Sequence, residues 1–133
     1  MKTLRMLVVE DEFLSRNLLI RMIQRYGTVD GAVDGNEAMS ALKAAYEDGH
    51  PYDLVFLDIM MPVKDGQTTL QELRLFEESR GILPTDSCRV IMVTALGDAK
   101  NVMAAFKHQC EGYITKPYSM EAIKEIVEKV AGS

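Results

Sequence analysis

Five short apolar segments alternate along this chain with segments whose apolar residues recur at helical spacing. The apolar segments span residues 4–9, 29–33, 54–57, 89–93 and 112–115. Continuous apolar runs are typical of strands in a parallel sheet, because helices cover both faces of such a sheet. The alternation therefore predicts an α/β fold, in which a doubly wound, five-stranded parallel sheet carries five helices joined by right-handed crossovers.

The five expected helices are placed by their apolar spacing and by the residues that start them. The first runs from the acids after residue 9 to residue 26, with apolar positions Leu14, Leu18, Leu19, Met22, Ile23 and Tyr26. The second follows the cap Asp34, and the third follows Asp65-Gly66, with Glu77 away from its apolar face. The fourth begins near Gly97, and Ser119 caps the fifth.

Length and composition indicate one soluble globular domain. With 133 residues the chain is too short for two ordinary domains, so we expect a single domain over residues 1–133 with no effector domain. A net charge of −5 argues against a nucleic-acid partner, and no apolar run is long enough to span a membrane. There is no signal-peptide pattern, and Cys88 and Cys110 fit no metal or redox spacing. We therefore expect two buried thiols in a cytoplasmic protein.

Polar residues stand at the ends of four of the five expected strands. Glu10 and Asp11 follow the first strand, Asp58 the third, Thr94 the fourth and Lys116 the fifth. The carboxyl ends of parallel strands lie at one edge of the sheet, where open α/β sheets bind their ligands. For Asp11 or Asp58 alone, capping a helix is an equally good interpretation. The convergence of all these side chains favours a functional site.

Three carboxylates brought together repel one another, and two unit charges about 4 Å apart cost roughly 4 kcal/mol at an effective dielectric constant near 20. Lys116 offsets part of this repulsion, and a small divalent cation offsets it better. Oxygen donors without Cys or His indicate Mg²⁺ or a similar hard ion, held by Asp11 and Asp58. A cation, a lysine and a hydroxyl around one carboxylate suggest phosphoryl transfer to Asp58, with Lys116 and Thr94 contacting the phosphoryl oxygens.

Four short motifs carry a resemblance to a known family. They are Val8-Val9-Glu10-Asp11-Glu12, Leu57-Asp58-Ile59-Met60-Met61-Pro62, Val93-Thr94-Ala95 and Thr115-Lys116-Pro117. In this order and at strand ends, they resemble the acidic pair, phosphoacceptor loop, hydroxyl switch and lysine motif of the receiver domain of bacterial two-component response regulators. The match covers the whole chain and is closest in size to the stand-alone chemotaxis or phosphorelay type. It implies a flavodoxin-like fold with strand order 2-1-3-4-5.

The resemblance also implies roles for particular residues. Asp58 would be the phosphoacceptor. The ligands of Mg²⁺ (or Mn²⁺) would be Asp11, Asp58, the backbone carbonyl of Met60 and, through water, Glu10. Tyr113 would be the aromatic side chain that turns inward when Thr94 moves toward the phosphoryl group. The Lys116–Pro117 peptide bond would be cis.

The implied function is a phosphorylation-controlled signalling switch, which is not an enzyme but promotes its own aspartyl phosphorylation and dephosphorylation. The donor would be a sensor histidine kinase or a histidine phosphotransfer protein. An unidentified downstream protein would read the face formed by the fourth helix, fifth strand and fifth helix. Two rival functions share parts of the pattern. A flavodoxin-like ligand binder would need a loop rich in Gly, Ser and Thr, and an aspartate-nucleophile phosphatase would carry a second acid at the position of Met60.

Overall fold

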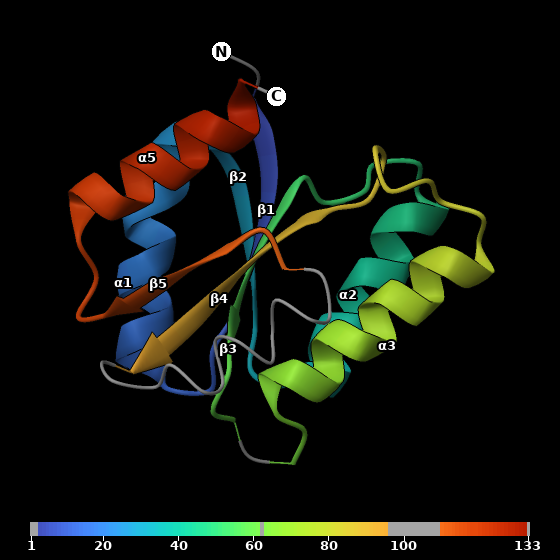
Figure 1. Cartoon of the computed structure of the whole chain (residues 1–133). Coiled ribbons are helices and arrows are strands. Elements are labelled where there is room, and N and C mark those ends of the chain that lie inside the picture. Colours follow the sequence, from blue (N-terminus) through green and yellow to red (C-terminus); the bar gives the residue numbers. More distant parts are fainter. Residues whose placement is uncertain (1–2, 62, 96–109, 133) are drawn as a thin grey trace.

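The computed structural model describes residues 3–61, 63–95 and 110–132, and all five expected strands form one sheet (Figure 1). The strands are β1 (Leu4–Val9), β2 (Gly27–Ala32), β3 (Leu54–Asp58), β4 (Arg89–Ala95) and β5 (Gly112–Lys116). Every neighbouring pair is parallel, and the order is β2-β1-β3-β4-β5. The predicted sheet and the strand order that the resemblance implied are therefore confirmed.

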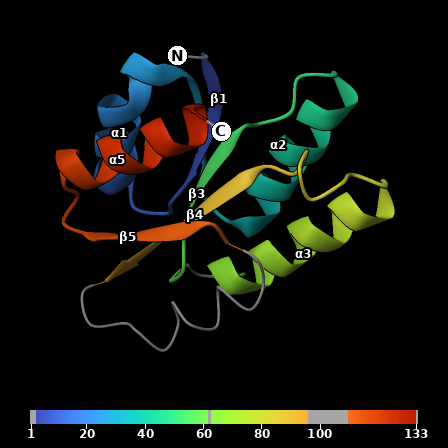
Figure 2. The ribbon, with the colours of Figure 1, turned by 45° about the horizontal axis from the view of Figure 1, so that its top comes forward.

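Helices cover both faces of the sheet (Figures 1 and 2). On one face lie α1 (Phe13–Ile23), which continues into a 3-10 turn at Gln24–Tyr26, and α5 (Met120–Ala131). On the other face lie α2 (Gly35–Glu47) and α3 (Gly66–Ser79). The helix expected near Gly97 falls outside the described residues. Among the helices that are described, none is both long and apolar enough to cross a membrane.

Strand side chains alternate between two cores, one on each face of the sheet. In β1, Leu7 and Val9 pack into the core beneath α2 and α3, whereas Met6 and Val8 pack into the core beneath α1 and α5. Each fully buried side chain of this size stabilises the fold by about 1.5–3 kcal/mol. The continuous apolar runs follow from this two-sided burial, and the two cores hold the strand ends in a fixed register.

Three predicted helix caps are present. The side chains of Asp34, Asp65 and Ser119 accept hydrogen bonds from the backbone N–H groups of Glu37, Thr68 and Ala122, at 2.8, 2.8 and 3.3 Å. Each cap satisfies an N–H group that has no partner inside its helix. The caps thereby define where α2, α3 and α5 begin, and α2 and α3 both begin at the carboxyl edge of the sheet.

The buried side of α1 is narrower than its apolar spacing predicts. Leu19 and Ile23 are buried, but Leu14 is 72% exposed and Leu18 is 52% exposed. Leu14 and Leu18 lie one turn apart and so form a single row along the helix surface, away from the core. Helical spacing shows which residues share a row along a helix, but not which row the sheet covers, and here the sheet covers the row of Leu19 and Ile23.

Glu77, expected on the exposed side of α3, is instead buried, with 3% of its surface exposed. Its carboxylate accepts hydrogen bonds from the Tyr46 hydroxyl at 2.9 Å and from the Cys88 backbone N–H at 3.0 Å. Arg74 forms an ion pair with it at 2.7 Å. Glu77 therefore joins α2, α3 and the residue before β4. Cys88 and Cys110 are buried free thiols, as predicted.

We expect Glu77→Ala to lower the free energy of unfolding by about 3 kcal/mol, because it removes the carboxylate that the Tyr46 hydroxyl, the Cys88 N–H and the Arg74 guanidinium share. The adjacent Glu78 is exposed, so Glu78→Ala is the matched control, with an expected change below about 0.5 kcal/mol. Urea unfolding followed by circular dichroism measures both variants. Equal losses of stability in the two variants would contradict the role assigned to Glu77.

Candidate functional site

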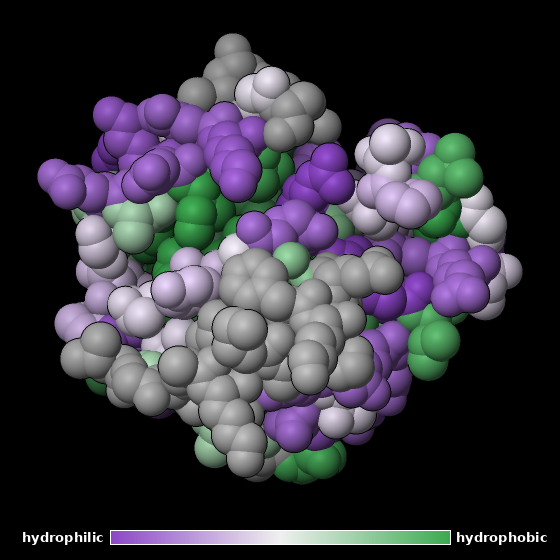
Figure 3. Space-filling model, viewed as in Figure 1, coloured by the Kyte–Doolittle hydropathy of each residue, from purple (hydrophilic) through white to green (hydrophobic). Residues whose placement is uncertain are grey.

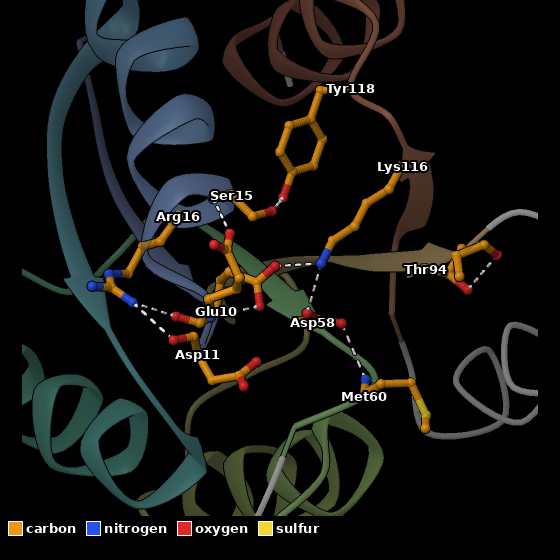
Figure 4. A network of polar contacts seen from close by, with 11 residues as sticks. Glu10, Asp11, Ser15, Arg16, Asp58, Met60, Thr94, Lys116 and Tyr118 are labelled. Atoms are coloured by element: carbon orange, nitrogen blue, oxygen red, sulfur yellow. Dashed lines mark hydrogen bonds and ion pairs between the residues drawn. The ribbon is translucent and has the colours of Figure 1, made fainter.

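The sheet topology brings the predicted polar residues to one edge. Glu10 directly follows β1, Asp58 ends β3 and Lys116 ends β5. Because β1 pairs with β3, and β4 pairs with both β3 and β5, these three strand ends lie close together. Figure 4 shows the side chains of Glu10, Asp58 and Lys116 pointing toward one another. The convergence expected from the strand ends is present.

Three carboxylates at this edge form a group that can hold a metal ion. Ligand oxygens of Glu10, Asp11 and Asp58 all lie within 4.8 Å of one another. Glu10 and Asp58 are 2% and 5% exposed, whereas Asp11 is open to solvent. Hard oxygen donors with an open side suit Mg²⁺ or Mn²⁺, because Mg²⁺ keeps several of its waters when it binds. The donor set therefore fits the predicted cation.

Lys116 neutralises part of this negative charge. Its Nζ lies 3.1 Å from Asp58 Oδ2 and also forms an ion pair with Glu10 (Figure 4). Burial alone would lower the pKa of Lys116, but its contacts with Glu10 and Asp58 raise that pKa above its usual value. The ammonium group therefore stays charged at neutral pH, as contact with phosphoryl oxygens requires.

The two buried carboxyl groups have opposite pKa shifts. Burial and the neighbouring Glu10 raise the pKa of Asp58 to about 7, although Lys116 opposes the shift. Burial would also raise the pKa of Glu10, but its hydrogen bonds with Asp58 and Lys116 lower it to about 2. In the metal-free chain Asp58 is therefore the carboxyl group of this pair that is protonated more readily. A cation at this site would favour the ionised form of Asp58, which a nucleophile must have.

The raised pKa of Asp58 makes the stability of the metal-free chain depend on pH. Its pKa is 3.8 in a solvated carboxyl group and about 7 in the fold. Between these values the folded chain binds more protons than the unfolded chain, so the fold gains stability as the pH falls from 7 toward 3.8. Above pH 7 Asp58 is charged beside Glu10, and the free energy of unfolding is lowered by the full amount that corresponds to the raised pKa.

We therefore expect Asp58→Asn, which cannot ionise, to raise the free energy of unfolding more at pH 8 than at pH 5. At 1.36 kcal/mol for each pKa unit, the difference between the two pH values is on the order of 2 kcal/mol. Urea unfolding in the presence of a chelator measures it, with the exposed Asp48→Asn as control. A gain that is equal at both pH values would contradict the raised pKa.

The segment after Asp58 contacts both the side chain and the backbone of Asp58. The Met60 N–H donates a hydrogen bond to Asp58 Oδ1 at 3.1 Å, while the Met60 side chain points away from the carboxylates (Figure 4). Only glycine fits at position 66, because a Cβ there would lie 2.2 Å from the Asp58 carbonyl oxygen. Gly66, interpreted from the sequence as a turn and capping residue, thus also lets α3 begin against the Asp58 backbone. Pro62 of the same motif lies outside the described residues.

Thr94 and Tyr113 occupy the strand positions expected of them. Thr94 is buried near the end of β4, and its hydroxyl donates a hydrogen bond to the Ala95 carbonyl at 3.3 Å. Figure 4 shows Thr94 to one side of the contact between Asp58 and Lys116. Tyr113, on β5, is exposed. Their switch roles stay predictions, whereas the Lys116–Pro117 bond is cis, as the resemblance implied.

Sequence reasoning missed several residues that support the acids. Arg16 Nη1 donates hydrogen bonds to the backbone carbonyls of Glu10 at 2.8 Å and Asp11 at 3.4 Å, so α1 holds the loop that carries both acids. The available signal was the position of Arg16 in the first turns of the helix after the acids. Ser15 and Tyr118 also form a hydrogen bond, and their separation of 103 residues left no local signal.

Fold and site together define an α/β domain with an acidic, lysine-bearing site at the carboxyl edge of its sheet. The family model for the response regulator receiver domain matches residues 6–128. The chain therefore belongs to the family of response regulator receiver domains, which act in two-component signalling.

Curated relatives agree with this family. The chemotaxis protein CheY of Halobacterium salinarum is 30% identical over 127 residues, which cover 95% of each chain. The regulatory protein VanRB of Enterococcus faecalis is 32% identical over 127 residues, which cover 95% of this chain and 51% of VanRB. The chain thus spans nearly all of this CheY but about half the length of VanRB.

Solved structures share the fold. A putative response regulator from Chloroflexus aurantiacus has a TM-score of 0.81 at 22% identity, with 99% of this chain and 100% of that chain covered. The co-crystal structure of the Saccharomyces cerevisiae histidine phosphotransfer protein Ypd1 with the receiver domain of Ssk1 also has a TM-score of 0.81. That match has 21% identity and covers 96% of this chain and 88% of that chain.

Proposed function

We propose that this chain is a phosphorylation-controlled signalling switch that accepts a phosphoryl group on Asp58. The observation that carries the proposal is the meeting of one buried carboxylate with two further carboxylates and a lysine. Lys116 Nζ lies 3.1 Å from Asp58, and the oxygens of Glu10 and Asp11 lie within 4.8 Å of those of Asp58. Membership of the receiver family supports the same assignment.

In the proposed reaction, an ionised Asp58 oxygen attacks the phosphorus atom of a phosphohistidine donor. A phosphorus–oxygen bond forms, the phosphorus–nitrogen bond breaks, and its electron pair stays on the imidazole. Lys116 stabilises the negative charge on the phosphoryl oxygens, and the Met60 N–H holds the Asp58 oxygen that it already contacts at 3.1 Å. Attack by water on the aspartyl phosphate then resets the switch, so the chain promotes its own dephosphorylation.

A divalent cation, Mg²⁺ or Mn²⁺, supplies positive charge to carboxylate and phosphoryl oxygens when it is bound. Asp11 and Asp58 would hold it directly, together with the backbone carbonyl of Met60. Glu10 would contact it through water, as the resemblance to the receiver family implies. The exposed Asp11 leaves a path by which a phosphoryl donor reaches the site.

The donor in this proposal is a sensor histidine kinase or a histidine phosphotransfer protein. The receiver domain of Ssk1 was crystallised with the phosphotransfer protein Ypd1. On this chain, Phe13, Leu14 and Leu18 expose apolar side chains on the helix that follows the acids. Exposed apolar patches mark protein-binding surfaces, so the row of Leu14 and Leu18, with Phe13 beside it, suits a protein donor. We place the signalling in the cytoplasm, where free thiols such as Cys88 stay reduced.

The output is proposed to pass to a downstream protein that reads β5, α5 and the expected fourth helix. Between β5 and α5 lies a groove of about 380 Å³, lined by the apolar Ile91, Ile126 and Val130 and by Tyr113. Figure 3 shows hydrophobic side chains, in green, in the hollow between α5 and the strands. A movement of Tyr113 on phosphorylation would change the shape of this groove, which a partner could detect.

Incubation with a small phosphodonor and Mg²⁺ tests the proposed function. We expect the intact mass of the chain to rise by one phosphoryl group, because Asp58 is the nucleophile. The gain should be absent in Asp58→Asn and retained in Asp48→Asn, which changes an exposed aspartate outside the site. No gain in the native chain, or an undiminished gain in Asp58→Asn, would contradict the proposal.

A further inference from the structure

Next to the cation site, two hydroxyl groups that are not part of it form a hydrogen bond with each other. The Ser15 Oγ and the Tyr118 hydroxyl lie 2.8 Å apart (Figure 4). Ser15 belongs to the first turn of α1, and Tyr118 lies between β5 and α5. The contact thus joins the helix that follows Glu10 and Asp11 to the segment that follows Lys116.

The two residues of this hydrogen bond lie on the two segments that the ion pair between Glu10 and Lys116 also joins. On one side, Ser15 lies in the first turn of α1, the helix that directly follows the loop of Glu10 and Asp11. On the other side, Tyr118 is two residues after Lys116, whose Nζ contacts Glu10 and Asp58. The Ser15–Tyr118 hydrogen bond therefore joins the segment that follows Glu10 to the segment that follows Lys116, and the ion pair between Lys116 and Glu10 joins the same two parts of the chain again.

The Tyr118 ring is well placed to anchor the end of β5. It packs against the core beneath α1 and α5, and only its hydroxyl reaches Ser15. A phenylalanine would fill the same space in this core, so the hydroxyl adds a directed contact and not merely volume. A lysine side chain has considerable rotamer freedom, and its head group stays in one place only when its backbone and its partners are held.

We propose that Ser15 and Tyr118 are positioning residues, whose hydrogen bond holds the Lys116 segment so that the ammonium group stays beside Asp58. This inference rests on the proposed phosphoryl transfer to Asp58. The pair does not touch the phosphoryl group and acts only through Lys116 and Glu10. Loss of either hydroxyl releases the segment after β5 and slows the transfer.

The variants Tyr118→Phe, Ser15→Ala and their combination test this inference. Ser15→Ala leaves the backbone N–H that donates to the Glu12 cap unchanged, so α1 keeps its start. Tyr52→Phe is the matched control, because the Tyr52 hydroxyl donates to Asp30 at 2.6 Å and Asp30 lies on β2, apart from the site. Ser15→Thr keeps a hydroxyl and serves as the rescue variant.

With a small phosphodonor at saturating Mg²⁺, we expect each single variant to react about three- to tenfold more slowly, the loss typical of one hydrogen bond. The double variant should be no slower than the slower single variant, because both remove the same bond. Ser15→Thr and Tyr52→Phe should react at the native rate. The affinity of Tyr118→Phe for Mg²⁺, measured by amide NMR shifts, should stay within about twofold of native. A variant that merely disturbed the fold would lose Mg²⁺ affinity as well as reaction rate.

Native rates in Tyr118→Phe and Ser15→Ala, or losses that simply add in the double variant, would overturn the inference. A crystal structure of metal-free Tyr118→Phe gives an answer that does not depend on phosphoryl transfer. Displacement of Lys116 Nζ from Glu10 and Asp58 supports the inference, and an unmoved Nζ overturns it. Failure of the native chain to take a phosphoryl group would instead count against the proposed function.

Discussion

The crowding of negative charge at the carboxyl edge of the sheet is the constraint on which the rest of the site depends. Glu10 and Asp58 are buried there with Asp11 beside them, and the ammonium group of Lys116 contacts both buried acids. Each pair of like charges at such distances costs a few kcal/mol at the effective dielectric of a protein. Any event that adds or removes charge here must therefore shift the balance of contacts around Lys116.

The residues that stabilise the fold are different from the residues that form the acidic site. Two apolar cores hold the strands from both faces, so the strand ends cannot relax away from one another. Additional polar contacts hold the connecting loops, as when Arg16 binds the carbonyls of Glu10 and Asp11. Gly66 allows α3 to begin against the backbone of Asp58. The destabilising acids are thus carried by an otherwise well-packed domain.

Features that repeat along the chain were predictable, and features set by contacts between distant elements were not. The strands follow from two-sided burial, and the caps at Asp34 and Ser119 follow from local hydrogen bonding. The meeting of the acids follows from parallel topology, because all strand ends of such a sheet share an edge. By contrast, Glu77 lies in an amphipathic pattern that predicts exposure, and two of its partners lie outside its own helix, on α2 and just before β4. The exposure of Leu14 likewise depends on how α1 sits on the sheet.

The central claim is that the three acids form one divalent-cation site around Asp58. Amide NMR during a Mg²⁺ titration tests it most directly, since the metal needs no partner protein. We expect saturable shifts concentrated at residues 10–12 and 58–60, and a large loss of affinity in Asp11→Asn but not in Asp48→Asn, which lies outside the site. Shifts that do not saturate, or an Asp11→Asn variant that binds Mg²⁺ as tightly as the native chain, would contradict it.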